Sequence, residues 1–131
     1  MNAETARYAR ITHRLALGVA SEDDEASQAL AELLQRRIVD SIAVECTPYV
    51  TSDLLSARLA QAVAALSEHN IALRITDGGM AVEGCFCQSD VCEHPQALLQ
   101  RLLGAEIEPI TTQDGQKVLR VIGALDAASY T

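Results

Sequence analysis

The chain has 131 residues, 49% of them hydrophobic and only 3% aromatic, and its 10 basic and 18 acidic residues give a formal charge of −8. This length suits one domain, and the acidic balance argues against direct binding to nucleic acid or to an anionic membrane, because both attract basic surfaces. No apolar run approaches the ~18 residues of a membrane span and residues 1–20 lack a signal-peptide core, so we expect a cytoplasmic protein whose four cysteines are thiols or metal ligands rather than disulfides.

Residues 3–19 are predicted to form an amphipathic helix. Its expected apolar face, spaced by three and four residues, is Tyr8, Ile11 and Leu15. A basic stripe lies beside that face and consists of Arg7, Arg10 and Arg14. We interpret the stripe as a solvated or partner-facing flank rather than a phosphate-binding face, because the helix is short and the chain is acidic.

A second helix is predicted from the acid-rich turn at residues 20–25 to about Val39, with Ser21 as its N-cap. Its expected apolar face is Leu30, Leu33, Leu34 and Ile38. The next segment, Ser41–Cys46, is short and partly alternating, which favours a strand that ends before Pro48.

The rest of the chain is predicted to contain two hairpins. The Asp-Gly pairs at 77–78 and 114–115 are each flanked by strand-like segments, and such pairs favour tight turns. Between the hairpins, Pro95 and Gly104 mark the first turn and the end of a helix. Pro109 is expected to place its strand at a sheet edge or a bulge, because proline cannot donate to the ladder.

Residues 52–84 and 95–123 thus follow the same order of a helix and two strands. We predict an α+β fold in which these two α-β-β units pair into one antiparallel sheet, with the N-terminal helices packed on it. The whole chain, 1–131, is expected to form a single domain with a helical part at 1–50 and the α-β-β-α-β-β part at 52–123. The final residues, DAASYT, are expected to form a tail.

Four soft or borderline metal ligands follow the first hairpin in a C-x-C-x4-C-x-H pattern. They are Cys85, Cys87, Cys92 and His94. Zinc binds thiolate and imidazole tetrahedrally, and a structural zinc site is closed by four such ligands. The loop between a strand end and a helix start lets backbone wrap around an ion. We therefore predict a Cys3His zinc site, with Cys46 as an alternative to His94 for the fourth ligand.

The same cysteines are compatible with three further roles. Thiolates also hold iron–sulfur clusters, although the usual ferredoxin spacings are absent here. A cysteine beside a helix start has a lowered pKa, which suits redox or thiol chemistry. Free cysteines can also act as small buried apolar residues.

Outside the cluster, catalytic signals are weak. His13 and His69 stand alone and are expected at the surface or at helix ends rather than in a site. The sequence contains no glycine-rich phosphate loop, no nucleophile elbow and no His-Glu-x-x-His motif. It therefore gives little direct support for an enzyme.

Leu55 to Gly123 contains the helix RLAQAVAAL, the hairpin IALRITDGGMAVEG, two spaced cysteines, the helix ALLQRLLG and the hairpin EIEPITTQDGQKVLRV. This order resembles the C-terminal effector domains of SufR-like winged-helix regulators, which are similar to vinyl-reductase-type small-molecule-binding domains. In that family one cysteine ends the first hairpin and another precedes the next helix, as Cys85 and Cys92 do here.

The match departs from the family at the closing strand, which often carries a further cysteine. Here that strand offers Val118, Leu119 and Arg120. Cys87 and His94 are additional, so a metal is expected to be held within the local loop. Residues 1–50 show no winged-helix part, and the resemblance therefore implies an effector domain standing alone.

Together these observations predict a cytoplasmic, metal-containing ligand-binding or sensor domain, with a role in transcription regulation implied by the resemblance. The alternative is a small thiol- or metal-dependent enzyme or a metallochaperone. The expected partners are a second copy of the chain, held through the N-terminal helices, and a small hydrophobic ligand in a cavity between helices and sheet.

Overall fold

The computed structural model describes residues 3–77, 79–88 and 92–124, so Gly78 of the first predicted turn and the predicted C-terminal tail lie outside the described residues. The helices are α1 (Ala3–Ala20), α2 (Glu25–Cys46), α3 (Leu55–Ser67) and α4 (His94–Leu103), with a 3-10 turn η1 (Thr47–Tyr49) after α2. The strands are β1 (Ala72–Thr76), β2 (Gly79–Gly84), β3 (Ala105–Thr111) and β4 (Lys117–Ala124). The predicted α+β class is confirmed.

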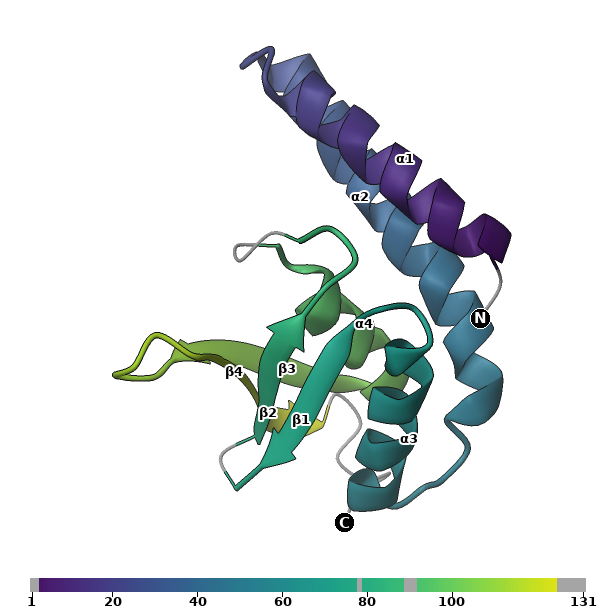
Figure 1. Cartoon of the computed structure of the whole chain (residues 1–131), viewed down its shortest axis with the longest axis vertical. Helices are drawn as coiled ribbons and strands as arrows, with labels where there is room; N and C mark the ends of the chain where they lie inside the picture. The colour runs from purple at the N-terminus through teal and green to yellow at the C-terminus, as the bar shows by residue number, and fades with distance from the viewer. Residues whose placement is uncertain (1–2, 78, 89–91, 125–131) are drawn as a thin grey trace.

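The four strands form one antiparallel sheet in the order β1-β2-β4-β3. Each α-β-β unit supplies one hairpin, and the two hairpins join through the central strands, where Met80 is paired with Leu119. Helix α3 packs on β1 and α4 packs on β3 (Figure 1). Pro109 lies in β3, an edge strand, as predicted. A side chain at Gly79 would meet β4, because its Cβ would lie 2.3 Å from the Leu119 carbonyl oxygen.

Helices α1 and α2 form a long antiparallel hairpin whose tip extends away from the sheet (Figure 1). The strand predicted at Ser41–Cys46 was wrong, because this segment is the last part of α2. Its apolar residues continue the helical period of Ile38, and they bury Ile42 and Cys46 on the same face. Pro48 ends the helix instead of a strand.

The start of α2 also differs from the prediction. Asp24, not Ser21, is the N-cap: its Oδ1 accepts a hydrogen bond from the backbone N–H of Ser27 over 2.8 Å. Ser21 instead donates to the carbonyl oxygen of Gly18, at the end of α1.

The buried face of α1 is not the predicted one. The large side chains of the expected face are exposed by 43% at Tyr8, 53% at Ile11 and 57% at Leu15. The buried residues are Ala9, Thr12, His13 and Ala16. These are mostly small residues, which let α1 approach α2 closely and leave the bulky stripe turned outward. On α2, Leu30 and Leu33 are likewise exposed, and Ile38 is the fully buried member of the predicted face.

The main core lies between the sheet and helices α2, α3 and α4. Its most buried large side chains include Ile42, Leu66, Met80, Leu98 and Leu119. The end of α4 follows the predicted chemistry, since Gly104 adopts a left-handed conformation there. Asn70, three residues after the end of α3, also has a positive φ of 60°. None of the helices within the described ranges has both the length and the apolar character of a membrane span.

Candidate metal centre

The predicted metal loop connects β2 to α4. β2 ends at Gly84, and the chain then turns so that the Gln88 N–H donates to the Cys85 carbonyl oxygen over 2.9 Å. Gln88 has a left-handed φ of 58°, which turns the chain back. Cys92 and His94 lie at the start of α4, with Pro95 in its first turn. The turn and the helix start therefore present their side chains to one another.

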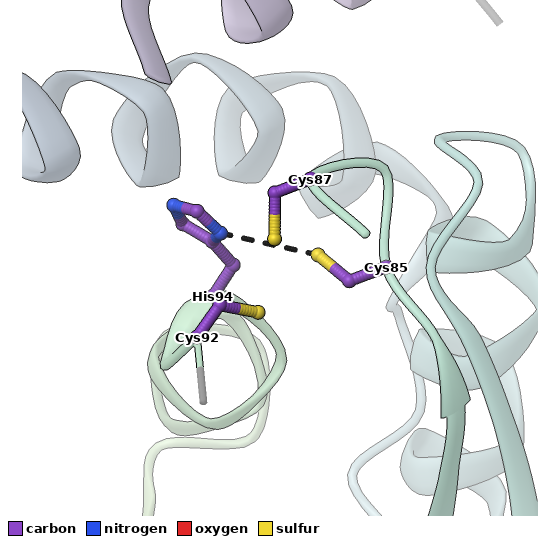
Figure 2. A group of neighbouring side chains, drawn as sticks. All are labelled: Cys85, Cys87, Cys92 and His94. Carbon is purple, nitrogen blue, oxygen red and sulfur yellow. Dashed lines mark hydrogen bonds between the residues drawn. The ribbon is translucent and has the colours of Figure 1, made fainter. Parts of the chain in front are cut away.

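All four predicted ligands meet in one group. The ligand atoms of Cys85, Cys87, Cys92 and His94 lie within 4.8 Å of one another (Figure 2). Cys85 Sγ is 3.9 Å from His94 Nδ1. In a tetrahedral zinc site with Zn–S near 2.3 Å, neighbouring ligand atoms are about 3.5–3.8 Å apart. The group therefore needs only a small contraction to enclose one ion, and this Cys3His cluster could hold a metal.

His94 has the orientation that a metal ligand needs. Its ring is buried, with 4% of its surface exposed, and Nδ1 points toward the sulfur atoms (Figure 2). On the other side of the ring, Nε2 lies 2.6 Å from Oε1 of Gln35, on α2. Because an amide oxygen only accepts, Nε2 carries the proton, which leaves the Nδ1 lone pair free for a metal.

The thiols differ in their affinity for protons. The pKa of Cys92 is lowered to about 3, mainly because the Cys85 thiol donates a hydrogen bond to it. The pKa of Cys85 is raised by that same hydrogen bond and by burial. The hydrogen bond thus favours the thiolate form of Cys92, and a metal bound by both sulfur atoms would displace the Cys85 proton, since thiolates rather than thiols are the ligands.

Two aromatic rings, those of Phe86 and His13, pack against the ring of His94. These contacts were not predicted from the sequence. The Phe86 ring lies tilted on His94 with centroids 5.0 Å apart, and His13 meets the edge of His94 at 5.2 Å. His13 was expected at the surface or at a helix end, but it lies inside α1 and is buried because it faces α2. His69 lies just after the end of α3, as the helix-end alternative predicted, but it is buried rather than exposed. The small-residue face that includes Ala9 and Ala16 was the signal that could have located His13.

Cys46 does not join the group formed by the other three cysteines. It is 1% exposed, at the end of α2, and burial raises its pKa to about 11. It lines a separate cavity of about 720 Å³ together with Glu45 and His69. The structure thus brings His94, and not Cys46, into one group with Cys85, Cys87 and Cys92.

Comparison with known proteins gives no relative: no protein-family model matches the chain, and no match was found among curated proteins or solved structures.

Proposed function

We propose that the chain is a metal-containing sensor module in which Cys85, Cys87, Cys92 and His94 bind one zinc ion. The observation that carries this proposal is the convergence of their four ligand atoms within 4.8 Å. Three thiolates and one imidazole match the donors and the number that zinc prefers. An iron–sulfur cluster would instead spread its ligands over several iron atoms.

The ligand set favours binding over catalysis. Catalytic zinc keeps one position for water or substrate, whereas four protein ligands fill the tetrahedron. The ion would then hold the end of β2 against the start of α4. Binding or loss of the ion would then depend on how much metal is available and on whether the thiols are reduced, and a sensor could respond to either quantity. The resemblance of residues 55–123 to regulator effector domains supports the same role.

We further propose that the module takes a small apolar ligand beside the metal. A groove of about 470 Å³ runs between the α1–α2 hairpin and the start of α4, and this volume is in the range of small-molecule sites. Its apolar lining includes Ala16, Ala31, Val39 and Ala97. Cys92 and His94 line the same groove, so a ligand there would contact the metal loop.

Two copies of the chain are proposed to associate through α1. Tyr8, Ile11 and Leu15 form a stripe on the exposed side of α1, and large apolar side chains in such a stripe are typical of interfaces. A two-fold contact would let the same stripe serve both copies.

The metal proposal is tested by measuring zinc content and the cobalt(II) spectrum of protein prepared under reducing conditions. We expect about one ion per chain and a spectrum typical of a tetrahedral thiolate site. Cys87→Ser and His94→Asn should weaken binding strongly. Cys46→Ala is the matched control and should keep the ion, because Cys46 lies outside the group.

A wild-type protein that is fully folded, holds no metal and has all its cluster thiols free would contradict the proposal. Loss of the ion in Cys46→Ala with retention in His94→Asn would assign the fourth ligand to Cys46 instead.

A further inference from the structure

Three polar side chains from three helices form a continuous hydrogen-bond network beside the metal loop. His94 of α4 contacts Gln35 of α2, with Nε2 2.6 Å from Oε1. The Gln35 amide nitrogen lies 3.1 Å from Nδ1 of His13, on α1. His13 Nδ1 is also 3.4 Å from Gln35 Oε1, but Oε1 already accepts from His94, and the shorter contact is to the amide nitrogen. The hydrogen bonds therefore run from His94 to Gln35 and from Gln35 to His13.

We infer that Gln35 and His13 are positioning residues that hold His94 in its metal-binding orientation, and that they couple metal binding to the docking of the α1–α2 hairpin. This inference rests on the proposed metal site and adds its regulation. A histidine ligand usually donates its second ring N–H to a neighbour that fixes ring and tautomer, and Gln35 Oε1 fills that role.

The directions of these hydrogen bonds favour one tautomer of the His94 ring. Gln35 offers one acceptor and one donor group, so accepting from His94 turns its amide nitrogen toward His13. His13 must then accept at Nδ1 and carry its own proton at Nε2. If the His94 ring flipped, Nδ1 would leave the sulfur atoms and the bond to Gln35 would be lost. The tautomer that binds a metal is thus the one that keeps α1 and α2 connected to the loop.

Ring packing strengthens this connection. Phe86 belongs to the metal loop, and its centroid lies 5.0 Å from that of His94 and 6.3 Å from that of His13. The His13 and His94 rings are 5.2 Å apart in an edge arrangement. His13 and His94 are both at least nine-tenths buried. A metal that orders the loop and His94 would therefore also order the inner face of α1.

Coupling of this kind is reciprocal, because a metal that favours the docked hairpin must be bound more tightly by it. The hairpin carries both the exposed stripe of α1 and one wall of the apolar groove. Metal occupancy would in this way control the surfaces that we propose for partner and ligand.

The test compares the full chain with Gln35→Met, which keeps the length of the side chain but removes both hydrogen bonds, and with Gln35→Glu, which keeps the acceptor for His94. Gln28→Met is the matched control, since Gln28 lies on the same helix and makes a side-chain hydrogen bond to the Ala20 carbonyl oxygen. The zinc affinity is measured by competition with a chromophoric chelator. The His94 tautomer is read from long-range proton–nitrogen NMR, and hydrogen exchange of α1 is followed with and without zinc.

We expect Gln35→Met to lower the zinc affinity about 10- to 100-fold and to abolish the protection of α1 by zinc. Gln35→Glu should bind zinc within about threefold of wild type with His94 protonated at Nε2, and Gln28→Met should match wild type. If Gln35→Met does not fold, His13→Phe replaces it: this variant keeps a ring against Phe86 but cannot accept from Gln35, so it should bind zinc more weakly than wild type, and zinc should protect α1 less.

Two results would overturn the inference while the metal site stands. One is wild-type affinity and NMR signature in Gln35→Met, and the other is zinc-bound wild type in which the exchange of α1 is unchanged. Failure of wild type to bind zinc at all is a different result, and it would remove the proposed function together with this inference.

Discussion

Lys117, the first residue of β4, donates a hydrogen bond from its ammonium group to the backbone carbonyl oxygen of Cys92 over 3.0 Å. The second hairpin therefore contacts the metal loop that follows the first one. Three thiolates around the proposed divalent ion would leave a net charge of −1 on the site. The Lys117 ammonium, bound to the Cys92 carbonyl oxygen, would then partly balance that charge.

Lys117→Met should therefore weaken zinc binding. A partly exposed charge interaction of this kind contributes about 1 kcal/mol, which corresponds to roughly a fivefold loss of affinity. Arg120→Met is the matched control, because it removes one positive charge from the same strand at a residue paired with Glu108. Chelator competition on both variants checks the prediction, and an equal loss in both would contradict a specific role for Lys117.

The elements that could be predicted from the sequence are those that depend on local chemistry. The Asp-Gly pairs gave the two hairpins, and Pro95 with Gly104 gave the bounds of α4 to within a residue. The gathering of Cys85, Cys87, Cys92 and His94 into one group was also predictable, because these residues lie within ten positions of one loop and few conformations are needed to bring them together.

The parts that could not be predicted depend on contacts between distant segments. Ser41–Cys46 alternates like a strand, and its place in α2 follows from its burial against the core. The inner face of α1 was misidentified because large side chains were expected to be buried, whereas the close packing of two helices buried Ala9 and His13. The contact of Gln35 with His94 could not be predicted from the sequence, since the two residues are 59 positions apart along the chain.

We expect ionisation of the Cys46 thiol to reduce the stability of the fold at high pH. Its pKa is raised to about 11 by burial, so the folded chain keeps a proton that the unfolded chain loses from about pH 9. The folded state then binds more protons, and the free energy of unfolding falls as the pH rises from about 9 to about 11.

Urea unfolding of wild type and Cys46→Ala at several pH values measures this effect, since the other thiols are common to both proteins. The stability advantage of wild type should shrink by roughly 2 kcal/mol between about pH 8 and about pH 11. An advantage that stays constant over this range would show that Cys46 ionises equally in both states.

We expect protonation of His69 to reduce the stability of the fold as the pH falls into the mildly acidic range. Its side chain is 6% exposed and burial lowers its pKa, an effect that Glu45, 4.0 Å away, partly opposes. The unfolded chain then takes up a proton near pH 6.5 that the folded chain resists, so stability is lost as the pH falls below this value. In His69→Gln this contribution is absent. The difference in unfolding free energy between wild type and variant should therefore shrink from pH 7.5 to pH 5, and a pH-independent difference would exclude it.

Substitution of Ile11 tests whether α1 forms an interface between two copies of the chain. It is 53% exposed in the single chain, so Ile11→Asp should leave the fold of one copy intact. At a dimer seam, however, the carboxylate would lose its water, and the dimer should dissociate. Val44→Asp is the matched control, because Val44 is 70% exposed on α2 outside the stripe of Tyr8, Ile11 and Leu15. Sedimentation should show a dimer for wild type and Val44→Asp and a folded monomer for Ile11→Asp. A wild-type chain that stays monomeric at high concentration would instead leave the stripe as ordinary exposed surface of α1.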